Sequence, residues 1–274
     1  MEESVDKRRF AWQPLTPRGV SAFVGAALGR LLLVQLTVAL VAAAVVIWFL
    51  HSGWFSAVNT AIGKLPLQGE IRRGKLQWQA DSPVSLAENR FLSIAVNLDH
   101  SGEMRAPAHV QVEFGRDHVK IFSLLGYVQT AYPRRWVVSF NRVELQPWWG
   151  SWEPALLALA GLVTLGGLML SWAGLATAYC WLAWLIGLLA NRDLDLKGSW
   201  RLAGAALMPG ALFLTGAMVV YGLGAMDLVR LAFAGAIHFV VGWVYLIISP
   251  LWLPRHPAVS EEIANPFQKS QIKN

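Results

Sequence analysis

Polar side chains within the last apolar stretch are the first candidates for chemistry. Asp227, His238 and Tyr245 are spaced by 11 and 7 residues, and an α-helix would place them within roughly 20° of one another. Arg230 would lie about 60° to one side. Ionisable residues at membrane depth normally face a bundle interior or a watery cavity, where they transfer protons or bind substrate. These four residues form the candidate intramembrane polar face.

A structural role is the alternative for the same face. Asp227 and Arg230 lie at the start of the stretch, where they can pair at i,i+3 and reach water. His238 is then the group nearest mid-depth, and a lone polar residue in a bundle often makes an interhelical hydrogen bond. We expect a structural hydrogen bond for His238 ahead of a role in transport.

Histidines in the polar middle of the chain raise the possibility of a metal site. They are spaced by nine residues, which matches no compact ligand motif, and the only cysteine, Cys180, lies elsewhere. We expect His109 and His118 on the water-facing side of strands. The sequence also lacks the nucleophile-elbow, phosphate-loop, HExxH and dinucleotide motifs. It predicts no catalytic residue, cofactor or metal. The side chains considered are His100, His109 and His118 with Asp99, Glu113 and Asp117.

Long apolar stretches determine the fold class. They cover residues 31–50, 155–190, 202–223 and 228–253, and about 20 apolar residues suffice to cross a bilayer core of ~30 Å. A composition of 55% hydrophobic and 15% charged residues excludes an ordinary soluble domain. We predict a membrane α-helical bundle of four transmembrane helices with an inserted extracytoplasmic antiparallel β domain, of class α+β. The first partner is the lipid bilayer.

The predicted boundaries follow from these stretches. The stretch 153–190 is longer than one crossing needs. Two crossings would place the basic loop 191–200 outside the cell, so we predict one span with an interfacial extension. The segments are an N-terminal tail (1–26), helix 1 (27–52), the β-rich domain (53–152), helix 2 with its extension (153–190), a loop (191–200), helix 3 (201–223), helix 4 (227–253) and a C-terminal tail (254–274).

Basic residues predict the orientation. Short flanks rich in Lys and Arg stay in the cytoplasm, whereas segments longer than about 60 residues cross regardless of charge. Both termini and the 191–200 loop should therefore be cytoplasmic, and residues 53–152 extracytoplasmic, in a bacterial inner membrane. The net charge of +6 is spread over the flanks, so we expect no nucleic-acid partner. The flanking residues are Lys7, Arg8, Arg9, Arg18, Arg30, Arg192, Lys197, Arg201, Arg255, Lys269 and Lys273.

The domain 53–152 has the pattern of strands. Residues 55–65 have helical spacing and end at Pro66, so the first helix should continue outside the membrane. Beyond Pro66, apolar residues alternate with polar ones in 75–79, 92–98, 110–114 and 136–140, which indicates half-buried strands. Turn residues at 73–74, 101–102 and 115–117 favour hairpins. We expect a small antiparallel sheet.

Tryptophan, proline and glycine residues add detail to the helices. Tryptophans collect at headgroup depth, and those at both ends of the domain are expected to be interfacial anchors ahead of carbohydrate-stacking residues. Pro209 should kink the third span. Small residues in the second and third spans favour close helix contacts. The anchors are Trp54, Trp148, Trp149 and Trp152; the small residues are Gly161, Gly166, Gly167, Ser171, Gly174, Gly204, Gly210 and Gly216.

Several short segments carry a family resemblance. They are IGKLP (62–66), GEIRRGKL (69–76), IAVNLD (94–99) and LKGSWRLA (196–203), together with Pro209. The chain resembles a bacterial multi-pass membrane family of uncharacterised function, some members of which are labelled maltodextrin utilisation proteins, and distantly the Yip-type helical bundles. The resemblance would cover about residues 30–253 and implies architecture more than activity.

Three functions remain open at this point. The first is a scaffold or accessory subunit that presents a periplasmic sheet domain to a protein partner or to a second copy of the chain. The second is a small transporter or permease-associated component that uses Asp227 and His238. The third, a membrane-bound enzyme acting on the cell envelope, has the least support because no reactive cluster is visible. We expect no enzymatic activity.

Overall fold

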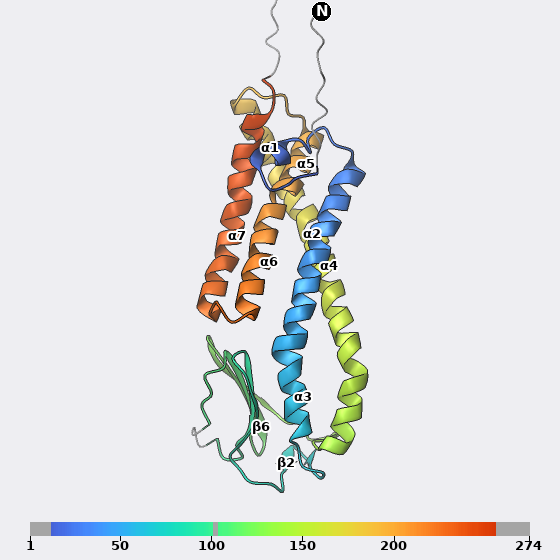
Figure 1. Ribbon diagram of the computed structural model, residues 1–274, viewed down its shortest axis with the longest axis vertical. Helices are drawn as coiled ribbons and strands as arrows, with labels where there is room; N and C mark the ends of the chain where they lie inside the picture. The colour runs from blue at the N-terminus through green and yellow to red at the C-terminus, as the bar shows by residue number, and fades with distance from the viewer. Residues whose placement is uncertain (1–11, 101–103, 256–274) are drawn as a thin grey trace, which may run out of the picture. The chain divides into compact units, whose positions relative to one another are not determined.

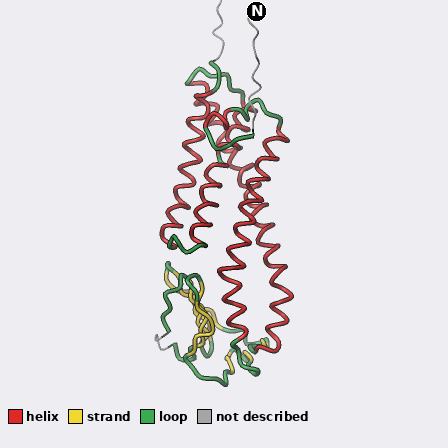
Figure 2. Tube along the Cα trace, in the orientation of Figure 1, coloured by secondary structure: helices red, strands yellow, loops and turns green. Residues whose placement is uncertain are grey.

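The computed structural model describes residues 12–100 and 104–255. Within these ranges, four helical segments are long and apolar enough to cross a membrane: Leu28–Gly63, Arg142–Leu189, Leu196–Gly222 and Leu228–Trp252. In the sequence, the described strands all fall between the first and second segments; they are drawn as arrows in Figure 1 and in yellow in Figure 2. The predicted α+β fold class is confirmed, and the spans imply a lipid bilayer. Of the two predicted tails, 1–26 and 254–274, residues 1–11 and 256–274 lie outside the described residues.

The first segment continues as a helix beyond its apolar part, as predicted. A short helix, α1 (Pro17–Ser21), precedes it and is capped by Thr16. α2 (Leu28–Phe49) passes into a π-helical turn, η1 (Leu50–Phe55), and then into α3 (Ser56–Gly63). The helix ends before Pro66, because a proline disfavours helical geometry in the residue that precedes it.

The second segment is a long continuous helix, α4 (Arg142–Leu189). It starts at Arg142 because Asn141 Oδ1 accepts the Glu144 N–H at 3.0 Å and caps the helix. The helix therefore begins before residue 153, and the last part of the predicted domain 53–152 is helical. Since α4 has no break, the chain does not reverse direction between residues 153 and 189.

The third segment is broken next to Pro209. α5 (Leu196–Ala206) and α6 (Met208–Gly222) meet at Leu207, where the missing N–H of the proline removes one helical hydrogen bond. Beside it, Gly210 approaches the backbone of α7 (Leu228–Ile248) so closely that a Cβ atom would lie 2.4 Å from the His238 carbonyl oxygen. The 3₁₀ helix η2 (Ser249–Trp252) ends the fourth segment.

The chain divides into two compact units, each described by itself. One unit contains the described residues up to Ala39, residues Gly167–Leu214 and the described residues from Gly235 onward. The other contains Leu40–Gly166 and Thr215–Ala234. The second unit includes residues 66–141, which we call the sheet module, and the ends of α6 and α7 that meet at residues 223–227.

The strands of the sheet module form two sheets in the described part of the chain. β1 (Glu70–Arg72) lies between β2 (Lys75–Gln77) and β8 (Val137–Ser139). Arg73 and Gly74 both have positive φ values, 53° and 75°, so the predicted turn joins β1 to β2. The larger sheet has the order β3–β4–β5–β6–β7, with strands β3 (Val84–Glu88), β4 (Leu92–Val96), β5 (Val110–Phe114), β6 (His118–Ser123) and β7 (Gly126–Ala131).

The larger sheet is mixed, which corrects the prediction of a fully antiparallel sheet. β4 and β5 are parallel, because residues 97–109 are long enough to carry the chain back to the same end of the sheet. The expected 101–102 turn lies outside the described residues. The apolar face packs on α3 through a core that includes Ala61, Leu65, Leu92 and Val96.

Candidate functional site

The other face of the larger sheet is polar, and much of it is buried. Glu113 of β5 is opposite Lys120 of β6, which is opposite Gln129 of β7, so the three side chains share one face. Gln111 and Glu113 are only 7% and 3% exposed. The sequence assigned this alternating polar set to the water-facing side. That assignment is wrong for β5, because residues from the β4–β5 connection cover it.

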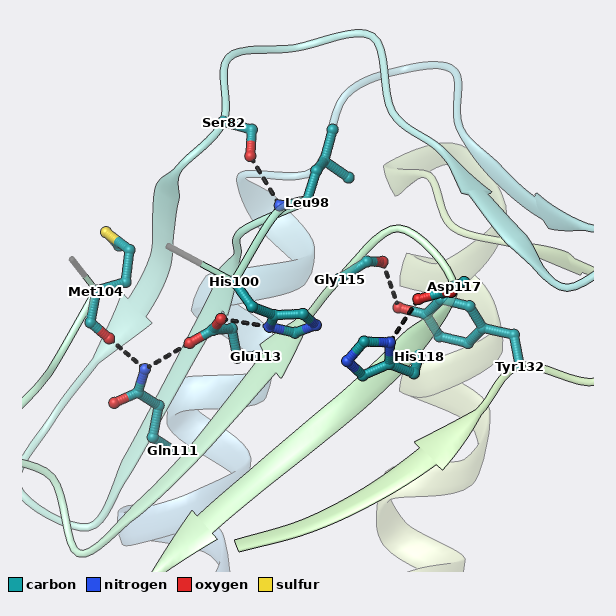
Figure 3. Close-up of polar contacts among 10 residues, drawn as sticks. All are labelled: Ser82, Leu98, His100, Met104, Gln111, Glu113, Gly115, Asp117, His118 and Tyr132. Carbon is teal, nitrogen blue, oxygen red and sulfur yellow. Dashed lines mark hydrogen bonds and ion pairs between the residues drawn. The ribbon is translucent and has the colours of Figure 1, made fainter. Parts of the chain in front are cut away.

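Buried polar partners satisfy the carboxylate of Glu113 (Figure 3). Oε1 lies 2.5 Å from Nδ1 of His100, and Oε2 accepts from the Gln111 amide at 3.3 Å. The same amide also donates to the Met104 carbonyl. A buried carboxylate is strongly destabilising unless donors surround it. The network therefore fixes the β4–β5 connection onto the sheet.

A second acid–histidine pair lies beside the first (Figure 3). His118 Nδ1 contacts Asp117 Oδ1, and this hydrogen bond holds the pKa of Asp117 below its usual value. The rings of His100 and His118 stack with centroids 4.3 Å apart. Contrary to the prediction, the His118 ring is therefore largely covered. Tyr132 donates to the Gly115 carbonyl at 3.0 Å, and burial raises the pKa of its hydroxyl.

The geometry of His100 indicates a structural role. A carboxylate on Nδ1 resembles the orientation of a general base, but Nε2 faces the backbone of Gly115, where a Cβ atom would lie 2.0 Å away. Substrate cannot reach that nitrogen. Among the described residues, no three His, Cys, Asp or Glu side chains are grouped to hold a metal ion.

Aromatic side chains join the sheet module to the helix ends within the second unit. His109 Nδ1 is 2.7 Å from the Tyr221 hydroxyl, near the end of α6. Phe91 contacts both Tyr221 and Phe49, with ring centroids 5.1 and 5.2 Å apart. His109 is thus partly covered and not a water-facing residue as predicted.

Charged groups near His109 affect its protonation. Burial and the cationic Arg90 lower the pKa of His109, and Asp227 opposes them more weakly. The neutral ring is therefore the favoured form at neutral pH, in contact with the Tyr221 hydroxyl.

Arg90 and Asn89 add direct hydrogen bonds at the same place. The guanidinium of Arg90 donates to the carbonyl of Gly224 and, at 2.9 Å, to that of Met226. The Asn89 amide donates to the Gly53 carbonyl at 2.6 Å. Side chains of the module therefore donate hydrogen bonds to backbone carbonyls of the first helical segment and of the α6–α7 turn. These bonds attach the module in addition to the covalent chain.

A cavity of about 750 Å³ opens between the polar sheet face and the start of α7. Lys120, Phe122 and Tyr127 line one side, and Asp227 and Leu228 line the other. This volume falls within the range of small-molecule sites. We take this cavity as the candidate functional site.

Three residues of the predicted polar face of the last helix, Asp227, Arg230 and His238, have partners at or within α7, and the fourth, Tyr245, has a partner near the start of the described chain. Asp227 Oδ1 accepts the Arg230 N–H at 2.7 Å and caps α7, and Oδ2 lies 3.5 Å from Arg230 Nε. His238 Nδ1 contacts the Gly235 carbonyl within α7, and Tyr245 donates to the Leu15 carbonyl at 2.5 Å. This contact of His238 lies within its own helix, whereas the prediction was a hydrogen bond between helices. Of the four residues, Asp227 lines the cavity.

The predicted tryptophan anchors differ in their surroundings. Trp148 and Trp152 are 54% and 51% exposed, with ring centroids 6.5 Å apart. Trp149 packs against Phe55, centroids 4.9 Å apart, and Trp54 packs against the core of the sheet module. Trp148 and Trp152 are therefore the more exposed pair among the four predicted anchors.

Sequence reasoning did not identify Arg90 or Tyr221 as site residues. Arg90 occupies a turn between two strands, and Tyr221 adjoins Gly222 at the end of a span; no spacing pattern distinguishes either residue. The one feature of the sequence that could have indicated a role for Arg90 is the presence of an arginine between two predicted strands of a membrane-attached domain.

Comparisons with known proteins give no relative: no family model, no curated protein and no solved structure matches the chain.

Proposed function

We propose that this protein is a non-catalytic scaffold or accessory subunit that holds its sheet module at the surface of a bacterial inner membrane for a protein partner. Four candidate spans support the membrane location, and the distribution of Lys and Arg supports a periplasmic module with cytoplasmic termini. The resemblance to the maltodextrin-utilisation-type membrane family is compatible with this role and stays a prediction.

The observation that carries the proposal is the exposed edge strand of a firmly attached sheet. β7 ends the strand order of the larger sheet, and each of its residues, Gly126–Ala131, is exposed. An edge strand offers unpaired N–H and C=O groups that can pair with an extended segment of another protein. Asn89 and Arg90 attach the same module to the first helical segment and to the α6–α7 turn. A fixed sheet with an open edge suits the display of a binding surface.

The chemistry inside the module supports recognition over catalysis. Glu113 and His100 engage each other, and the outer nitrogen of His100 faces Gly115. Transport has less support, because His238 and Tyr245 direct their polar atoms to backbone carbonyls.

Site-specific photo-crosslinking tests the proposal. A benzophenone amino acid replaces Gln129 on β7 in the full chain in its native membrane, and a matched probe replaces Lys75 on β2. We expect a discrete protein adduct from position 129 only, identified by mass spectrometry and absent when the identified partner is deleted. An adduct of twice the chain mass would identify a second copy as the partner. Equal adduct patterns from both positions would contradict a specific edge contact.

A further inference from the structure

The turn between β6 and β7 is apolar and exposed. Leu124 and Leu125 form it and are 59% and 97% exposed. Exposed apolar side chains at the tip of a hairpin are unfavourable in water and suit the boundary between headgroups and acyl chains. We therefore expect the two leucines of the tip to contact an apolar environment.

The position of the tip identifies that neighbour. Leu124 and Gly126 line the same cavity as Asp227, Leu228 and Val229, which start α7. α7 belongs to an apolar segment long enough to cross a membrane. The first residues of a spanning helix lie at headgroup depth, so the hairpin tip lies at that depth as well.

Two basic side chains of the cavity are available to an anion. Lys120 and Arg105 line it, and neither forms an ion pair with any residue in ranges 12–100 and 104–255. The two acids of the lining have partners of their own: Asp227 pairs with Arg230, and Glu113, opposite Lys120 on the neighbouring strand, contacts His100 and Gln111. Cations at a membrane surface attract lipid phosphates, and hydrogen bonds to charged groups are the strong ones.

We propose that this cavity binds the phosphate headgroup of an anionic glycerophospholipid, with Lys120 contacting the phosphate and with Leu124 and Leu125 inserted into the bilayer surface. Phe122 and Leu228 line the cavity as well and provide apolar contact for the glycerol end of the acyl chains. This site goes beyond the scaffold role, because it holds one end of the sheet module on lipid and leaves the β7 edge beyond Tyr127 open.

A binding measurement on the purified full chain in detergent tests the cavity. Dioctanoyl phosphatidylglycerol is the probe, and dioctanoylglycerol and inorganic phosphate are the comparison ligands. Replacing Lys120 with glutamine (Lys120→Gln) should weaken binding of the probe about tenfold, while the matched surface variant Lys75→Gln should bind it like the wild type. Unchanged affinity of Lys120→Gln would overturn the proposal. So would equal binding of dioctanoylglycerol, or of inorganic phosphate, which would identify a free-phosphate site.

A second measurement follows the hairpin tip without relying on lipid affinity. A polarity-sensitive dye is attached to Leu125→Cys or to Lys75→Cys in a Cys180→Ser background, and the protein is placed in vesicles of phosphatidylcholine with phosphatidylglycerol. We expect a blue-shifted emission from position 125 and a water-like emission from position 75. Water-like emission from both positions would exclude insertion of the tip. The β7 crosslink is measured in parallel on Lys120→Gln, so that failure of the lipid site and failure of the scaffold role are told apart.

Discussion

Arg90 is the residue at which the attachment of the sheet module is most open to test. Its guanidinium contacts the carbonyls of Gly224 and Met226, and lysine cannot reproduce this planar, two-pronged donor. Since the side chain is largely exposed, Arg90→Ala should cost only about 1 kcal/mol. We expect faster amide hydrogen exchange in residues 223–227 with little change in the core strand β4, measured on the full chain in nanodiscs.

The matched control is Arg72→Ala, which removes an exposed arginine 3.6 Å from Glu70 in the smaller sheet. This variant should leave exchange in residues 223–227 unchanged. Identical exchange in both variants and the wild type would show that Arg90 does not hold the turn.

His109 makes the same attachment depend on pH. Because its pKa in the folded chain lies below 6.5, the unfolded chain takes up the proton more readily, so stability is full above pH 6.5 and falls as pH drops below it. We expect a loss of thermal stability between pH 7.5 and pH 5.5 that is smaller in His109→Gln. Measuring the difference between the two proteins removes the contribution of the other histidines. Parallel pH profiles would contradict the assignment.

Strand β5 shows which properties of single residues the sequence could not predict. Alternation placed Gln111 and Glu113 on one face, which is correct, but alternation cannot say whether a face meets water or a covering segment. The β4–β5 connection covers this one. Arg90 and Tyr221 act through tertiary contacts, and no local pattern carries that information.

Glycines in α6 allow a matched test of helix packing. A Cβ atom at Gly210 would lie 2.4 Å from the His238 carbonyl oxygen, whereas a Cβ atom at Gly216 meets none of the described atoms within 4 Å. Overpacking against backbone costs about 1–3 kcal/mol, and alanine in an open helical position gains up to about 1 kcal/mol over glycine. Gly210→Ala should therefore lower the thermal unfolding temperature of the full chain in detergent.

Gly216→Ala in the same helix serves as the control and should unfold at the wild-type temperature or slightly above it. Equal unfolding temperatures for the two variants would show that the contact between Gly210 and α7 is not close. Several of the other small residues predicted to mediate packing, Gly166, Gly167 and Gly174, also have no described atom within 4 Å of an added Cβ. Small residues in a span thus indicate that a close helix contact is possible, but they do not identify which helix makes it.

Elements with a strong local signal were predicted well. Arg73 and Gly74 specified the β1–β2 hairpin through their positive φ values, and Pro66 marked the end of the first helical segment. The parallel pairing of β4 with β5 was missed because it depends on a long connection with no turn signature. The early start of α4 was missed because Trp148, Pro147 and Pro154 resemble a boundary, whereas the cap is Asn141.

At the scale of the whole molecule, the account depends on where the sheet module lies. In the topology that we propose, the four candidate spans would place both chain ends on one side of the bilayer and the sheet module on the other. Arg192, Lys197 and Arg201 near the start of α5 favour the cytoplasm for the side that holds the ends. We propose the partner contact at β7 and the lipid site at the hairpin tip for a module that faces away from the cytoplasm.

Cysteine labelling of intact cells tests this arrangement most directly. In a Cys180→Ser background, Lys75→Cys reports on the sheet module and Lys197→Cys on the loop between α4 and α5; both native side chains are exposed. A membrane-impermeant maleimide should label position 75 in intact cells and position 197 only after the membrane is opened. Labelling of position 197 but not of position 75 in intact cells would contradict the account.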